Sequence, residues 1–122
     1  GGGSGGGVLH TVRAAPDGHG VAELPGWPGL LLSRTYAGYI PVGSEDGLTM
    51  YEHYLFFESE GNPEKDPLIM WTNGGPGASS LFGAFSELGP YYLSDASLRT
   101  DDYNATGVPT LFENAYRWTR LG

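Results

Sequence analysis

The stretch from Leu68 to Pro90, "LIMWTNGGPGASSLFGAFSELGP", places an apolar run, a glycine-rich turn and a helix-like run in immediate succession. Residues 68–72 form a short and mainly apolar run, which is typical of a strand that is buried on both faces. After the glycines, apolar residues at 81, 82, 84, 85 and 88 have helical spacing, and Ser79 or Ser80 suits the N-cap. A turn in this position can offer several N–H groups to a negatively charged oxygen, helped by the positive end of the helix dipole.

Two chemistries use such a turn, and an ordinary tight turn is a third interpretation. Phosphate binding by a P-loop needs a lysine and a hydroxyl residue after the glycines, whereas Ala78 and Ser79 follow Gly77 and no lysine is near. The dinucleotide pattern also fails, because Ser80 stands in place of its last glycine. Two interpretations remain open from the loop itself: an ordinary tight turn, and an oxyanion hole for acyl transfer, which needs only N–H donors aimed at a developing negative charge.

The flanking sequence predicts an antiparallel hairpin before this stretch. Residues 33–42 and 48–59 are rich in aromatic and β-branched residues, and the short segment 43–47 between them has the composition of a turn. Residues 91–93 form one further short strand in an otherwise turn-rich remainder. Residues 1–21 read as a glycine-rich tail and flexible arm, so the G-x-S-x-G match near the start lies in a linker and is accidental.

Composition excludes several classes of function. The net charge is -8 and the six basic residues are scattered, which argues against a nucleic-acid partner. The absence of cysteine excludes a disulfide framework, and no apolar run approaches the roughly 20 residues of a membrane span. We expect no cofactor, no metal and no membrane association. The chain begins without methionine and stops without a helix cap, so we expect a fragment of a longer protein.

The segment "WTNGGPGASSLFGAFSELGP" closely resembles the glycine-loop signature of the serine carboxypeptidase family. The segments "YAGYIPV", "YEHYLFFES" and "PLIMW" resemble the first three strands of that family in order, and "GPYYLS" and "LFENAYRWTR" resemble its next part. The resemblance covers residues 22–122. It implies an α/β fold, namely the N-terminal portion of an α/β-hydrolase with an antiparallel hairpin, a third strand, the oxyanion loop, the first helix and an incomplete sheet.

The resemblance also assigns roles to individual residues. The N–H of Gly75 would be one oxyanion-hole donor. Asn73 and the N–H of Gly74 would bind the C-terminal carboxylate of the substrate, and Glu87 would belong to the same network. Phe82 and Ser86 would line the pocket for the departing residue. Ala78 stands where many family members have a disulfide-forming cysteine, which leaves the disulfide pattern open.

The family nucleophile and its Asp and His partners have no counterpart in these residues, so the fragment alone should be inactive. His53 lies among strand aromatics without a Ser or Asp signature, and we interpret it as a strand residue. The resemblance implies a serine-type carboxypeptidase that acts on peptide or protein C-termini through an acyl-enzyme. The alternatives are an acyltransferase on the same scaffold and a catalytically dead or truncated homologue that only binds. A secretory location follows from the resemblance, and Asn104 begins a glycosylation sequon.

Overall fold

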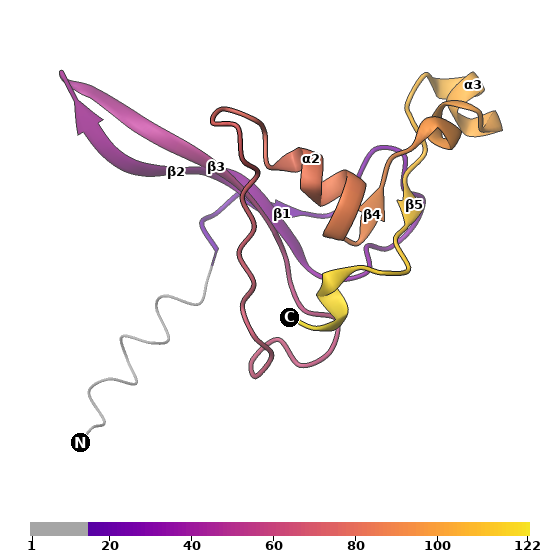
Figure 1. Cartoon of the computed structure of the whole chain (residues 1–122), viewed down its shortest axis with the longest axis horizontal. Coiled ribbons are helices and arrows are strands. Elements are labelled where there is room, and N and C mark those ends of the chain that lie inside the picture. Colours follow the sequence, from indigo (N-terminus) through magenta and orange to yellow (C-terminus); the bar gives the residue numbers. More distant parts are fainter. Residues whose placement is uncertain (1–14) are drawn as a thin grey trace.

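The computed structural model describes residues 15–122 as a small α/β arrangement of two antiparallel sheets and a few short helices (Figure 1). The larger sheet has the strand order β1-β2-β3, and the smaller one pairs β4 with β5. The first fourteen residues of the predicted tail, including the G-x-S-x-G match, lie outside the described residues. Within residues 15–122, no helix combines the length and the apolar character that crossing a membrane requires.

The predicted hairpin is confirmed as the longest feature of the molecule (Figure 1). Strand β2 (Thr35–Glu45) pairs antiparallel with β3 (Leu48–Phe57), in a register that sets Glu45 opposite Leu48. The turn is only Asp46 and Gly47, whose φ values of 50° and 78° are those of a type I′ turn. Such turns match the right-handed twist of the flanking strands, which explains why the turn is tighter than the predicted segment 43–47. The short strand β1 (Gly20–Val21) adds to β2 from within the segment predicted as a flexible arm.

The predicted third strand at residues 68–72 is wrong for this structure. These residues belong to no strand, and the side chains of Leu68 and Met70 are 81% and 85% exposed. In Figure 1 the segment rises alone from the 60–67 loop towards the start of α2. An apolar run is buried as a strand only when neighbouring strands pair with it. The described residues supply no such neighbour for it.

The predicted helix is confirmed from residue 81 onward. Helix α2 (Leu81–Gly83) continues directly into η1 (Ala84–Leu88), a turn of π-helix. Ser80 occupies the N-cap position, but its side chain makes no capping hydrogen bond. The Oγ of Ser79 accepts a hydrogen bond of 3.2 Å from the N–H of Leu81 instead. The Ser80 hydroxyl is thereby left to bond the glycine loop, as described below.

The C-terminal third packs around one buried tyrosine. Strand β4 (Tyr91–Tyr92), which confirms the predicted short strand, pairs with β5 (Phe112–Glu113). The remaining elements of this third are η2 (Asp95–Leu98), α3 (Asp101–Thr106) and η3 (Trp118–Arg120).

Tyr91 is 1% exposed, and its ring meets those of Trp27 and Phe57 edge to face at 4.7 and 6.0 Å. Its hydroxyl accepts a 2.8 Å hydrogen bond from the N–H of Leu32, so the buried polar atom is satisfied. This core joins the end of β3 to β4 and therefore fixes the C-terminal end of the helix relative to the hairpin.

Candidate functional site

The glycine loop presents two backbone donors that are not used within residues 15–122. The N–H groups of Gly74 and Gly75 donate to no acceptor among the described residues, and both residues are exposed. Gly75 has a φ of 150°, and a Cβ built there would lie 2.9 Å from the backbone nitrogen of Ala78. Only glycine fits this conformation without strain. The loop is therefore shaped so that its backbone can approach a ligand closely.

Two hydrogen bonds to its side-chain oxygen fix the orientation of Asn73. Its Oδ1 accepts hydrogen bonds from the indole Nε1 of Trp71 at 2.8 Å and from the N–H of Gly83 at 3.2 Å. Two N–H donors on one atom identify that atom as the oxygen. The Asn73 N–H donates to the Oγ of Ser80 at 3.0 Å, which ties the loop to the start of the helix. The Nδ2 of Asn73 donates to no group within residues 15–122, so both of its hydrogens are available.

Trp71 and Gly83 are two site residues that sequence reasoning missed. A Cβ at Gly83 would lie 2.3 Å from Nε1 of Trp71 and 2.9 Å from Oδ1 of Asn73. The missing side chain therefore lets the helix contact the loop directly. The available signal was a glycine inside a helical pattern, which costs about 1 kcal/mol relative to alanine and usually has a packing reason.

The predicted helix residues of the site, Phe82, Ser86 and Glu87, are exposed and form no hydrogen bond with Asn73 in the described part of the chain. Phe82 is 65% exposed, and the Ser86 hydroxyl donates back to the carbonyl of Phe82. Glu87 is exposed, and within the described part of the chain no hydrogen bond joins it to Asn73. Gly83, which bonds the Asn73 oxygen, lies one helical turn before Glu87. The fold thus places Asn73 beside the helix that carries Glu87.

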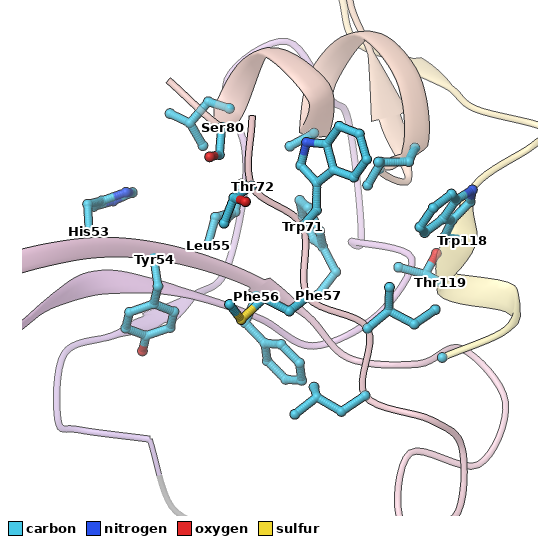
Figure 2. Close-up of a pocket in the computed structure, with 18 of the residues that line it drawn as sticks. His53, Tyr54, Leu55, Phe56, Phe57, Trp71, Thr72, Ser80, Trp118 and Thr119 are labelled. Atoms are coloured by element: carbon cyan, nitrogen blue, oxygen red, sulfur yellow. The ribbon is translucent and has the colours of Figure 1, made fainter. Parts of the chain in front are cut away.

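An apolar cavity of about 710 Å³ is lined in part by the segment 68–72 that leads into the loop (Figure 2). Its walls are β3 from residue 52 to 57, the segment 68–72, one side of the helical segment between Ser79 and Gly89, and the C-terminal residues Trp118, Thr119 and Gly122. The loop residues 73–75 and Glu87 are not among its walls. The cavity is therefore distinct from the donor cluster, although Trp71 and Ser80 border both.

His53 lies in the wall of this cavity, as Figure 2 shows. Its ring meets that of Tyr39 edge to face at 5.0 Å across the hairpin. No side-chain hydrogen bond to its ring occurs among the residues the structure describes. In that same part of the chain, no group of three His, Cys, Asp or Glu side chains has an arrangement that could hold a metal ion.

Comparison with known proteins agrees with the resemblance seen in the sequence. The model of a family described as serine carboxypeptidase matches residues 25–122. Serine carboxypeptidase-like 13 of Arabidopsis thaliana is 41% identical over 114 residues, which cover 93% of this chain and 25% of the relative. Serine carboxypeptidase-like 10 of the same plant is 42% identical, with coverage of 93% and 24%. Serine carboxypeptidase 1 of Hordeum vulgare is 40% identical over 109 residues, with coverage of 88% and 20%. The chain thus spans a quarter or less of the length of these relatives.

Proposed function

The chain belongs to the serine carboxypeptidase family, and from this premise we propose that the intact protein is a serine-type carboxypeptidase. It releases C-terminal residues from peptides or proteins through an acyl-enzyme. The observation that carries the proposal is the donor cluster at the glycine loop. There the Asn73 oxygen is tied to Trp71 and Gly83 while its amide hydrogens and two neighbouring backbone N–H groups are available.

Each donor has a distinct task in this proposal. The N–H of Gly75 stabilises the oxyanion that forms when the serine nucleophile attacks the scissile carbonyl. The Nδ2 of Asn73 and the N–H of Gly74 bind the terminal carboxylate, and Glu87 takes part in its recognition. Phe82 and Ser86 line the pocket for the departing residue. The nucleophile and its Asp and His partners belong to the intact protein, so this chain alone does not form an acyl-enzyme.

Recognition of a carboxylate beside Glu87 implies activity at acidic pH. When both carboxyl groups are ionised they repel each other, so the bound pair has to share a proton. As the pH rises the shared proton is lost, and the KM for substrates with a free terminal carboxylate increases. Replacement of Glu87 by Gln removes one charge and should make this KM less dependent on pH.

The test is an assay of the intact protein on N-blocked dipeptides that carry either a free carboxylate or a C-terminal amide. We expect release of the last residue from the free acid, with an acidic optimum, and loss of activity with a serine-reactive phosphonofluoridate. Full activity after such treatment would contradict the acyl-enzyme. Transfer of an activated acyl group to an alcohol, without peptide hydrolysis, would favour the acyltransferase. Absence of both reactions would favour a homologue that only binds.

We also propose that the intact protein passes through the secretory pathway and carries a glycan at Asn104. Asn104 begins an Asn-Ala-Thr sequon on α3, where it is exposed. Its side chain makes no hydrogen bond among the described residues. In Figure 1 this helix lies at the opposite end of the molecule from the tip of the hairpin.

Expression of the intact protein in a secreting eukaryotic cell should give a protein whose mass falls on glycosidase treatment. An Asn104→Gln variant with the same mass shift would contradict the assignment.

A further inference from the structure

Arg117 is a buried cation that joins two segments far apart in sequence. Its side chain is 7% exposed, and its Nε and Nη2 donate to the two carboxylate oxygens of Glu60 at 2.6 and 2.9 Å. The Thr119 hydroxyl donates to the same carboxylate, and the Glu60 N–H donates to the Thr119 carbonyl at 2.8 Å. The loop after β3 is thereby fixed to the C-terminal segment by both side-chain and backbone bonds. A two-pronged arginine–carboxylate pair specifies orientation as well as distance.

The third nitrogen of Arg117 reaches the helix that carries Glu87 through one intermediate residue. Its Nη1 donates to the Asn114 carbonyl at 3.1 Å. Asn114 is buried, and its Nδ2 donates to the carbonyls of Glu87 and Gly89, each at 2.9 Å. These two carbonyls lie at the C-terminal end of η1, where a helix has acceptors without partners of its own. Asn114 therefore holds the last turn of the helix in place.

The same ion pair also fixes Trp118, which packs against Trp71, the residue that bonds Asn73. Trp118 lies between Arg117 and Thr119 in sequence, and both of these neighbours bond Glu60. Its ring meets that of Trp71 nearly perpendicularly, at 84° and 6.2 Å between centroids. Figure 2 shows both tryptophans beside the cavity. The Nε1 of Trp71 in turn donates to the oxygen of Asn73. A continuous series of contacts thus runs from the ion pair to the amide of Asn73.

We propose that Arg117, together with Glu60 and Asn114, is a positioning network that sets Asn73 relative to the helix carrying Glu87. None of the three residues is assigned a contact with substrate. The inference rests on the proposed function, because it gives the network the task of keeping the carboxylate-recognition groups in register. A buried ion pair is weak support for a purely stabilising role, since its desolvation offsets much of its attraction. The pair reaches the helix end through Asn114 and reaches Asn73 through the two tryptophans, and this geometry favours positioning.

The first test compares Arg117→Met with the matched variant Arg99→Met in the intact protein. Arg99 is exposed and makes no side-chain hydrogen bond or ion pair in the described residues. Substrates with a free carboxylate and with a C-terminal amide are assayed on both variants. Arg117→Met should lower the preference for the free acid about tenfold, chiefly through KM, while Arg99→Met leaves the preference unchanged. An equal loss on both substrates would mean that Arg117 only keeps molecules folded, and would overturn the inference.

The second test does not depend on activity. Hydrogen exchange in the intact protein should become faster in Arg117→Met at the Gly83 amide and in residues 87–89, while the β2–β3 hairpin keeps its protection. Unchanged exchange at these positions would overturn the inference. If Arg117→Met does not fold, Arg117→Lys, which keeps the charge but loses the two-pronged geometry, is measured in the same way. If the wild-type protein has no peptidase activity, the proposed function is contradicted but the positioning network is not. The hydrogen-exchange result would then be the test of the network.

Discussion

At the scale of single residues, Asn73 offers the sharpest test of carboxylate recognition. Replacing Asn73 with Asp keeps an oxygen for Trp71 and Gly83 to bond but removes both amide hydrogens and adds a negative charge. A hydrogen bond to a charged group contributes about 2 kcal/mol, so kcat/KM for substrates with a free carboxylate should fall roughly 30-fold or more. The corresponding C-terminal amides carry no charge to repel and serve as the internal control. A similar fall for acids and amides in steady-state assays would contradict the assigned role of Asn73.

Gly83 tests the contact between helix and loop. In Gly83→Ala the new methyl group would meet the Trp71 nitrogen at 2.3 Å and the Asn73 oxygen at 2.9 Å. Overpacking of this kind costs about 1–3 kcal/mol, whereas the gain in helix propensity is only about 1 kcal/mol. We therefore expect a net loss of unfolding free energy in urea titrations of the intact protein. Gly20→Ala is the control, because a Cβ at Gly20 meets nothing within 4 Å. Equal stability of the two variants would show that Trp71 moves aside without cost.

The sequence predicted some of these residues and missed others for a physical reason. Gly75 and Asn73 lie in one short loop whose glycines indicate close approach of the backbone, while the roles of both residues were taken from the family resemblance and stay predictions. The roles of Trp71 and Gly83 depend on a contact between a loop and a helix that only the folded chain creates. Glu60 and Arg117 are separated by 57 positions, and no local pattern pairs them. Charged residues in turn-rich segments are most often solvated, so the pair could not be predicted.

At the scale of elements, the Glu60–Arg117 pair ties the loop after β3 to the segment before η3 and should do so even in acid. Burial raises the pKa of the Glu60 carboxyl, but the hydrogen bonds from Arg117 and Thr119 and the charges of Arg117 and Arg120 outweigh it. The pKa of Glu60 in the folded protein therefore lies below its usual value. A lowered pKa stabilises the folded state above the unfolded-state pKa, and this contribution is lost as the pH falls through the folded-state pKa.

We predict that in Glu60→Gln the unfolding free energy of the intact protein falls less steeply at acidic pH than it does in wild type. Wild type should be the more stable of the two near neutrality, and the difference should shrink as the pH falls from the usual pKa of a glutamate towards the lower pKa of Glu60 in the folded protein. Urea unfolding at several pH values down to about 3 measures this difference. A difference that does not change with pH would show that the Glu60 charge contributes nothing. The expected behaviour would keep the network closed under the acidic conditions proposed for activity.

Elements differed in how well the sequence predicted them, according to where their partners lie. The hairpin was predicted because two strand-like runs are adjacent and the short segment 43–47 between them has the composition of a turn. The helix was predicted because its apolar spacing is internal to the segment. Residues 68–72 were predicted as a strand on apolar character alone. A strand needs a pairing partner, and the described residues contain none for this segment.

At the scale of the whole molecule, the distribution of apolar side chains predicts that residues 22–122 do not fold as a stable monomer when expressed alone. Besides Leu68 and Met70, several large apolar side chains are more than one-third exposed around the cavity, namely Phe56, Ile69, Trp71, Leu81 and Trp118. The described core contains few fully buried large side chains. Strand β3 pairs only with β2, so its other edge is open within the described sheet. Open apolar edges promote association between chains.

We therefore expect residues 22–122 to show concentration-dependent oligomers in sedimentation, with no cooperative melt as a monomer. If the exposed apolar segment drives the association, Met70→Lys should weaken it, because a charge in that segment opposes stacking of apolar surfaces. Tyr116→Lys is the matched control, since Tyr116 is 87% exposed, close to the 85% of Met70, but does not line the cavity. Equal weakening by both variants would point to net charge instead of the apolar segment. A cooperative monomeric melt of the unmodified fragment would contradict the expectation, and would mean that the hairpin and the Tyr91 core stabilise this part of the fold by themselves.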